Sequence, residues 1–248
     1  MRVLATYNIK GGVGKTSAAV NLAYISAREG NRTLLWDLDP QGAATFLFRV
    51  RPRVRGGVRA LVKGRVPLDA PIKGTDFANL DLLPADFSYR NMDLALERSK
   101  RPVRRLAQLL KPLAAEYDVV ILDCPPSVSL VSEGVLRAAD TLLIPLVPTT
   151  LALRSFDQLT AFVAQAKPPR PVILAFFSMA DRRKRLHRDT ITQVRAERSD
   201  VAQAVVPAAS VVEQMGPRRL PVLLLSPSSE AARAYQGLWS EVRDGQSR

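Results

Sequence analysis

A glycine-rich segment near the amino terminus has the residue types and spacing of a phosphate-binding loop. It reads Lys10-Gly11-Gly12-Val13-Gly14-Lys15-Thr16-Ser17 and follows the apolar run 3–7. Glycines let backbone N–H groups approach phosphate oxygens, and the helix expected to begin here adds its own free N–H groups. In such a loop Lys15 would contact the β- and γ-phosphates and the Thr16 hydroxyl would bind Mg²⁺. The pattern therefore predicts a nucleoside triphosphate site.

Carboxylates follow two apolar runs that we expect to be strands. Asp37 and Asp39 end the first run, and Asp123 ends the second. Ligands of open α/β sheets bind beyond the carboxyl ends of the strands, and residues two apart on a strand point to the same side. We therefore expect Asp123 to help hold Mg²⁺ or its water shell, and the pair Asp37 and Asp39 to organise Mg²⁺ and position an attacking water. Cys124, the only cysteine, is interpreted as a small buried core residue.

Together these segments resemble the ParA/MinD family of deviant Walker A ATPases. The resemblance rests on three segments: the glycine loop with its additional Lys10, the run Asp37-Leu38-Asp39-Pro40-Gln41-Gly42, and the run Asp123-Cys124-Pro125-Pro126. In the loop, Ile9 stands where the strict P-loop pattern has glycine. The form of the second run is closer to the ParA/Soj branch than to MinD. Weaker similarities continue to the last predicted helix, so the resemblance spans nearly the whole chain.

The resemblance implies roles for individual residues. Lys10 would reach across an ATP-bound homodimer into the partner's nucleotide, and Asp39 would orient the hydrolytic water. Met179, in a Ser-Met-Ala-Asp segment, and Pro207, after two valines, would lie near the nucleotide base. Departures occur at Ala208 and in the run 211–216, where relatives carry arginines that contact DNA, so those roles do not transfer.

Positive charge is high and clustered. The chain has 36 Lys and Arg against 23 Asp and Glu, a formal charge of +13. Such patches bind phosphate backbones largely without sequence preference, and solvated faces of an arginine-rich protein are the alternative. Basic residues crowd 49–65 and 98–105, but the candidates favoured for non-specific double-stranded DNA are Arg182, Arg183, Lys184, Arg185, Arg188, Arg218 and Arg219. His187, inside this cluster, is interpreted as a surface residue.

Strand-like and helix-like segments alternate along the chain. We expect strands near 2–8, 32–37, 80–84, 118–123, 141–147, 171–178, 203–206 and 221–225, and helices near 15–29, 89–111, 127–138, 150–165, 187–198 and 229–243. This order predicts a single-domain α/β P-loop NTPase over residues 1–248, with a mostly parallel β-sheet flanked by helices on both faces. Residues 49–79 are expected to be a loop-like, basic surface insertion.

Composition supports a cytoplasmic protein. The chain of 248 residues is 47% hydrophobic, enough for one large core, and one cysteine excludes a disulfide framework. No apolar run approaches the roughly 18 residues of a membrane span, and Arg2 directly after Met1 gives no sign of a signal peptide.

The leading hypothesis is a ParA-like, nucleoid-associated ATPase that uses ATP and Mg²⁺. It would bind DNA as a homodimer and position a chromosome, plasmid or protein assembly, and a ParB-like or cargo-adaptor protein would stimulate slow hydrolysis. A MinD-like membrane ATPase is the alternative, but the last helix, with Gly237, Glu241 and Asp244, is expected to pack on the protein. An iron–sulfur relative would need several cysteines. A nucleotide-gated binding protein with negligible turnover would have the same sequence features.

Overall fold

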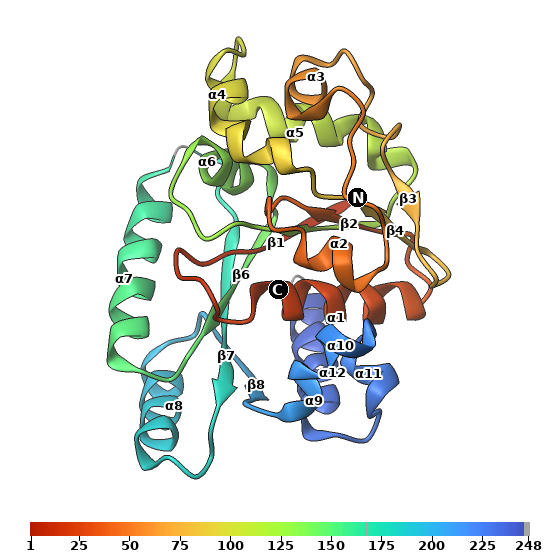
Figure 1. The fold of residues 1–248 in the computed structure, drawn as a ribbon. Coiled ribbons are helices and arrows are strands. Elements are labelled where there is room, and N and C mark those ends of the chain that lie inside the picture. The colour runs from red at the N-terminus through yellow and green to blue at the C-terminus, as the bar shows by residue number, and fades with distance from the viewer. Residues whose placement is uncertain (167, 246–248) are drawn as a thin grey trace.

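The computed structural model describes residues 1–166 and 168–245, which form a sheet between two helical layers (Figure 1). The strands of this sheet lie in the order β3-β4-β2-β5-β1-β6-β7-β8, and every neighbouring pair is parallel except β3 with β4. They are β1 (Arg2–Thr6), β2 (Thr33–Asp37), β3 (Lys73–Gly74), β4 (Leu80–Leu83), β5 (Val119–Asp123), β6 (Thr141–Leu146), β7 (Val172–Ala180) and β8 (Val201–Pro207). The predicted mostly parallel α/β sheet is confirmed.

Helices cover both faces of the sheet. One layer contains α3 (Gly57–Lys63), α4 (Met92–Glu97), α5 (Arg105–Leu110), α6 (Leu130–Ala138), α7 (Thr150–Gln165) and α8 (Arg185–Glu197), with the 3-10 segments η1 (Phe87–Asn91), η2 (Pro102–Arg104) and η3 (Lys111–Ala115). The other contains α1 (Lys15–Arg28), α2 (Ala43–Leu47), α9 (Ser210–Glu213), α10 (Met215–Arg218), α11 (Val222–Leu225) and α12 (Glu230–Asp244).

Strand β1 shows how the sequence fills both layers. Val3 and Ala5 pack into the core on one side of the sheet, and Leu4 packs into the core on the other side. Successive side chains of a strand point to opposite faces, so an uninterrupted apolar run is what a sheet covered on both sides requires. The central strands therefore hold their carboxyl ends in fixed positions.

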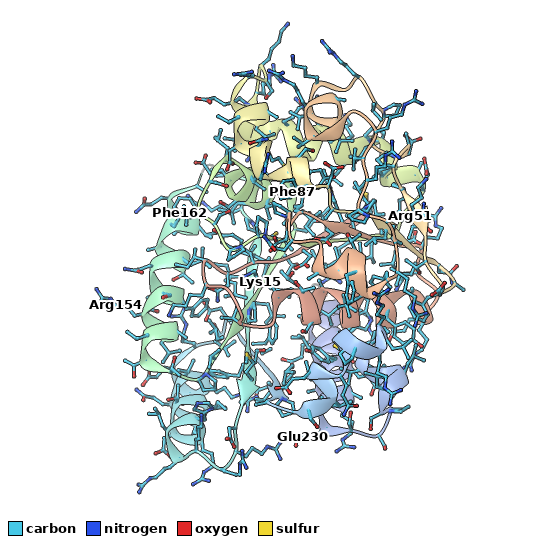
Figure 2. The ribbon with its side chains drawn as sticks, in the orientation of Figure 1. Lys15, Arg51, Phe87, Arg154, Phe162 and Glu230 are labelled. Atoms are coloured by element: carbon cyan, nitrogen blue, oxygen red, sulfur yellow. The ribbon has the colours of Figure 1, made fainter. Side chains whose placement is uncertain are left out.

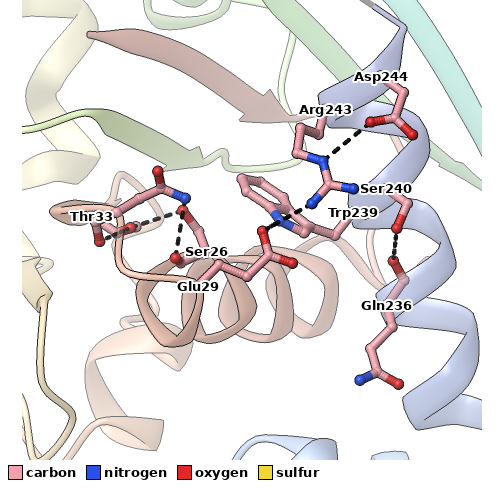
Figure 3. Close-up of polar contacts among 9 residues, drawn as sticks. Ser26, Glu29, Thr33, Gln236, Trp239, Ser240, Arg243 and Asp244 are labelled. Carbon is pink, nitrogen blue, oxygen red and sulfur yellow. Dashed lines mark hydrogen bonds and ion pairs between the residues drawn. The ribbon is translucent and has the colours of Figure 1, made fainter.

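The last helix packs on the first, as the sequence predicted (Figure 3). The buried face of α12 includes Tyr235, Leu238 and Trp239. The Trp239 indole Nε1 donates to the Glu29 carboxylate at 2.7 Å, and the Arg243 guanidinium lies 3.4 Å from the same carboxylate. The apolar face of this helix is thus used inside the protein. Within the described part of the chain, no helix is both long and apolar enough to cross a bilayer.

Three element predictions are wrong. The run 221–225 is not a strand but contains α11, whose first N–H, on Val222, donates to the buried Asn21 side chain of α1. The predicted loop 49–79 contains α3 and the edge strand β3, and its Val58 and Leu61 are buried in the core. The single helix expected over 89–111 is broken into η1, α4, η2 and α5, with Pro102 beginning η2.

Candidate functional site

The glycine loop joins β1 to α1 and adopts a backbone that only glycine enters freely. Gly12 has a φ of +69° and Gly14 a φ of +97°, both in the left-handed region. A Cβ on Gly14 would lie 2.6 Å from Ser178 Oγ, so a side chain there would collide with the end of β7. The loop can therefore hold its N–H groups beside the start of α1, where a phosphate would meet the unpaired N–H groups of the helix.

Lys15 is buried although it carries charge. Its side chain is 6% exposed, and its Nζ donates to the Lys10 carbonyl at 2.8 Å. Burial lowers the pKa of Lys15, while the nearby Asp123 carboxyl acts in the opposite direction. The Lys15 ammonium can therefore exchange its bond to the Lys10 carbonyl for a bond to a phosphate oxygen.

Asp37 and Asp123 lie side by side at the carboxyl ends of β2 and β5. Both are fully buried, and burial is the main cause that raises the pKa of each. Asp37 accepts hydrogen bonds on Oδ2 from the Thr45 N–H at 2.8 Å and the Thr45 hydroxyl at 2.7 Å. The Thr45 hydroxyl in turn accepts the N–H of Ala85 at 2.8 Å. The sequence analysis missed Thr45, because its role depends on α2 turning back over β2.

Asp123 keeps one carboxylate oxygen without a hydrogen-bond partner. Its Oδ2 is buried and unpaired, while Oδ1 accepts a long 3.4 Å bond from the Thr6 hydroxyl. The Lys15 ammonium and the Thr16 hydroxyl both act to lower the pKa of Asp123, against the effect of burial. An unpaired buried oxygen is costly unless a further partner completes it. The donor set of Thr16 and two carboxylates fits hydrated Mg²⁺, which prefers hard oxygen ligands and retains waters.

Asp39 lies beyond the end of β2, so strand alternation does not determine where its side chain points. The argument that Asp37 and Asp39 point to the same side because they are two apart on a strand is therefore wrong. Its own N–H donates to Asp37 Oδ1 at 3.3 Å, and its Oδ1 accepts the N–H of Gln41 at 2.9 Å. Unlike Asp37, it is only half-buried and lines the cavity at the loop. A half-exposed carboxylate in this position can contact a water beside a bound triphosphate.

A cavity of about 370 Å³ lies over the loop (Lys15 is labelled in Figure 2). Its lining includes Gly11, Gly12, Gly14, Lys15, Thr16, Ser17, Asp39, Ser178, Met179, Pro207 and Glu213. Met179, which lines the cavity, has a φ of +55°, a strained conformation for a side-chain-bearing residue. The structure therefore brings the two residues predicted near the base to the same cavity as the phosphate loop. Ser178, in the same predicted segment as Met179, also lines the cavity, whereas Glu213 had not been placed there.

Two residues of the predicted loop do not line this cavity. Val13 is buried in the protein, 5% exposed. Lys10 turns away from the loop, and its Nζ donates to the Leu151 carbonyl in the first turn of α7 at 2.8 Å. Lys10 is half-buried, but its bond to the carbonyl of the exposed Leu151 lies at the surface of the subunit.

The basic cluster at the start of α8 is largely paired with carboxylates. Arg182 pairs with Glu230 of α12 at 2.6 Å, Arg183 with Asp181 at 3.0 Å, and Arg185 with Asp189 at 3.4 Å. Arg183 lowers the pKa of Asp181 to about 2. Lys184 precedes the helix, and Arg188 donates to the Arg182 carbonyl at 2.9 Å.

His187 is not the surface residue that the sequence suggested. It is 6% exposed, and its Nδ1 accepts the N–H of Asp181 at 3.1 Å. The first turn of α8 thereby holds the loop that precedes it. A single histidine amid arginines gave no sequence signal for this contact.

Arg218 and Arg219 lie on a different part of the molecule from the α8 cluster. The Arg219 guanidinium stacks 3.9 Å from the centre of the Phe46 ring of α2, and the Arg218 carbonyl accepts a 3.4 Å bond from Arg49. The structure therefore joins these two arginines to the segment after α2. Among the described residues, neither of these two arginines forms a hydrogen bond or ion pair with Arg182–Arg188.

Fold and site together define a P-loop nucleotide-binding protein of the α/β class, with the loop, helix start and paired carboxylates at the edge where the central strands end. Residues 1–170 match the family model described as AAA domain. The chain is 34% identical over 251 residues to the chromosome partitioning protein ParA of Caulobacter vibrioides, covering 98% of this chain and 94% of that protein. It is 32% identical to the sporulation initiation inhibitor protein Soj of Bacillus subtilis, covering 97% and 98%.

A solved structure is similar over the same extent. Cobyrinic acid a,c-diamide synthase from Mycobacterium smegmatis, with a bound ATP analog and magnesium, superposes with a TM-score of 0.81 at 28% identity, covering 98% of this chain and 94% of that one. The chain belongs to the ParA/Soj family of chromosome- and plasmid-partitioning ATPases.

Proposed function

We propose that this protein is a Mg²⁺-dependent ATPase that forms an ATP-bound homodimer, binds double-stranded DNA without sequence preference and positions a cargo on the nucleoid. The observation that carries the proposal is the buried Lys15, Asp37 and Asp123 arrangement beside a glycine loop and an open cavity. Family membership supports ATP as the nucleotide and a chromosome, plasmid or protein assembly as the cargo.

In this proposal the residues at the loop bind and orient the triphosphate. Lys15 exchanges its bond to the Lys10 carbonyl for β- and γ-phosphate oxygens, and the N–H groups of the loop and of α1 bind the remaining oxygens. Thr16, with Asp37 and Asp123 behind it, would hold Mg²⁺, which neutralises phosphate charge. Asp39 orients the attacking water, and Met179 and Pro207 contact the base.

Lys10 is the residue we assign to the partner subunit's nucleotide. In the single chain its ammonium is held by the Leu151 carbonyl, an exposed contact that a second subunit could replace. Dimerisation would double the basic surface that DNA meets, so ATP would control DNA binding through the population of dimers. A ParB-like or cargo-adaptor protein would stimulate hydrolysis and release the dimer. Arg182–Arg188 and Arg218–Arg219 are candidate contacts in this proposal.

The MinD-like alternative requires a membrane-binding amphipathic helix. No observation on the described residues favours it, because the apolar face of α12 is already buried against α1 and β8. The proposal therefore assigns the nucleoid, in the cytoplasm, as the matrix.

Nucleotide-dependent assembly tests the proposal. The mass of purified protein would be measured by light scattering with Mg–ATP, Mg–ADP or no nucleotide, for the wild type and for Lys10→Ala. We expect a dimer only for the wild type with Mg–ATP and a monomer in every other condition. A monomer in all conditions, or a dimer regardless of nucleotide, would contradict the ATP-dependent dimer.

A further inference from the structure

The end of the molecule formed by α3, α4 and α5, with the adjoining segments, carries a group of basic residues that form no ion pair with a described carboxylate. We define the basic cap as the following residues: Arg51, Arg53, Arg55, Arg59, Lys63, Lys73, Arg98, Lys100, Arg101 and Arg105. They come from two stretches far apart in sequence, which meet because α3 packs against η1, α4 and α5. In Figure 1 these helices lie at the top, away from α8 and α12.

The cap is a fixed surface and not a mobile loop. Val54, Val58, Leu61 and Val62 are buried beneath it, and the Val58 N–H donates to Ser88 Oγ at 2.8 Å. The cations on the outside therefore project from a packed framework. Preorganised cations lose less conformational entropy on binding than cations of a disordered tail.

Two carboxylates near the cap, those of Asp86 and Asp93, are bonded to the backbone, whereas Asp69 and Glu97 are exposed. Asp86 accepts the N–H groups of Val54 and Ser88, each at 2.8 Å, and Asp93 accepts the N–H of Val131 at 2.9 Å. These acids serve the backbone and do not face the cap cations. Within residues 1–166 and 168–245, no ion pair involves a cap residue. The α8 cluster, in contrast, has three of its arginines paired.

Three hollows in the cap are lined by these cations and by no acid. Arg51, Arg53, Arg55 and Lys73 line one of about 610 Å³, and Arg59 and Arg98 line a second of about 350 Å³. Lys63, Lys100, Arg101 and Arg105 line a third of about 470 Å³. Figure 2 labels Arg51 at the right-hand side and Glu230, the partner of Arg182, near the bottom.

From these observations we infer that the basic cap supplies the larger part of the contact with duplex DNA, through its phosphate backbone. Arginine side chains suit phosphate oxygens because the planar guanidinium donates in pairs. No aromatic side chain lines the three hollows, which disfavours stacking on unpaired bases. The inference rests on the proposed DNA-binding function. It assigns DNA contact mainly to the basic cap, whereas the sequence analysis favoured Arg182–Arg188 and Arg218–Arg219.

Two charge-matched triple variants test the inference. The cap variant is Arg53→Ala with Arg55→Ala and Arg59→Ala, and the α8 variant is Arg183→Ala with Arg185→Ala and Arg188→Ala. Each removes the same net charge, so a difference between them reports location and not total charge. Binding to a labelled random-sequence duplex would be measured with ATP and without nucleotide at several salt concentrations. Thermal unfolding and ATP affinity, expected to be unchanged, control for folding.

We expect the cap variant to lose on the order of tenfold in affinity and to lower the slope of log affinity against log salt by roughly 2 to 3. The α8 variant should lose less than about threefold, because two of its three arginines, Arg183 and Arg185, already face carboxylates, and Arg188 is bonded to the Arg182 carbonyl. Equal losses, or a larger loss in the α8 variant, would overturn the inference but leave the proposed function. If the cap variant loses duplex affinity and the wild type binds equally with and without ATP, the result would support the basic cap as the contact surface. It would contradict the proposed control of DNA binding by ATP. A wild type that binds no duplex overturns both.

Anionic lipid is the competing matrix for such a surface. Vesicles of phosphatidylglycerol and phosphatidylcholine would be tested with the same variants. We expect duplex binding to exceed vesicle binding, since the exposed residues of α3 are Arg59 and Lys63 and the large exposed apolar residues beside them are Phe87 and Leu94. Vesicle binding that the cap variant abolishes, with duplex binding intact, would contradict the inference.

Discussion

The nucleotide cavity and the basic cap hold their charges in opposite ways. Around the cavity, Lys15, Asp37 and Asp123 are buried. The charges of Lys15 and Asp123 each shift the pKa of the other, and the charge of Asp37 raises the pKa of Asp123. On the cap, exposed arginines such as Arg53, Arg55 and Arg59 form no ion pair with any described carboxylate. Buried charge is costly unless its partners are in place, whereas exposed cations cost little and act through their sum. Single substitutions should therefore be severe at the cavity and mild on the cap.

The largest effect is expected for Lys15→Ala. This change removes the one buried ammonium at the loop, and the loss of charge-assisted bonds worth about 2–3 kcal/mol should weaken ATP binding at least roughly 30-fold. Titration calorimetry measures the affinity, with the exposed Lys111→Ala as the control that should bind normally. Near-normal binding by Lys15→Ala would remove the distinction between the two regions.

Asp39→Ala should separate binding from turnover. Asp39 is half-exposed at the cavity and bonded mainly to its own turn, so ATP affinity and DNA binding should be retained. Turnover should fall on the order of 100-fold or more, as expected when a water-positioning group is lost. Phosphate release under single-turnover conditions measures it. Persistent hydrolysis would sink the assigned role.

Gly14→Ala tests whether the loop backbone is as constrained as the geometry indicates. With a φ of +97° and a Cβ position 2.6 Å from Ser178 Oγ, the substitution should cost about 1–3 kcal/mol of stability and weaken ATP binding. Gly216→Ala is the matched control, because its φ is not positive and nothing lies within 4 Å of the added Cβ. Urea unfolding compares them, and equal stabilities would contradict the constraint.

Thr45→Val removes the hydroxyl that bonds both Asp37 and Ala85. Leaving the buried Asp37 carboxylate without this donor should lower the free energy of unfolding by about 1–3 kcal/mol. Thr160→Val, on the outer side of α7, loses only a bond to the helix carbonyl of Asp157 and should change it by less than about 0.5 kcal/mol. Chemical denaturation of both variants shows whether the carboxylate network carries this free energy.

The smallest effect is expected for Arg53→Ala alone. One exposed cation among many should change duplex affinity by less than about threefold and lower the salt slope by roughly 0.9. A much larger loss would mean that Arg53 makes a specific contact and that the cap does not act as a sum. Fluorescence anisotropy across salt concentrations distinguishes the two.

The sequence predicted the cavity far better than the cap. A strand, a glycine loop and Lys15 are consecutive in sequence, and Asp37 and Asp123 end apolar runs that had to be neighbouring buried strands, so local pattern placed them. Thr45 and His187 were missed because each acts through a contact with a segment that folds back on it.

Longer-range packing explains the remaining errors. The apolar run 221–225 could be strand or helix, since short apolar runs do not distinguish them, and the Asn21 side chain of α1 favours the helix by capping its start. Residues 49–79 look loop-like in sequence because they contain Gly56-Gly57 and scattered prolines, but Val54, Val58 and Leu61 anchor the segment in the core. Ion pairing of the α8 cluster also depends on Glu230, distant in sequence.

Duplex binding with ATP, ADP or no nucleotide, for the wild type and Lys15→Ala, tests the central claim of an ATP-controlled DNA-binding switch most directly. The account predicts salt-sensitive binding that requires ATP and is lost in Lys15→Ala. Binding of equal strength in all nucleotide conditions would contradict it, and would reduce the net charge of +13 to general attraction for polyanions.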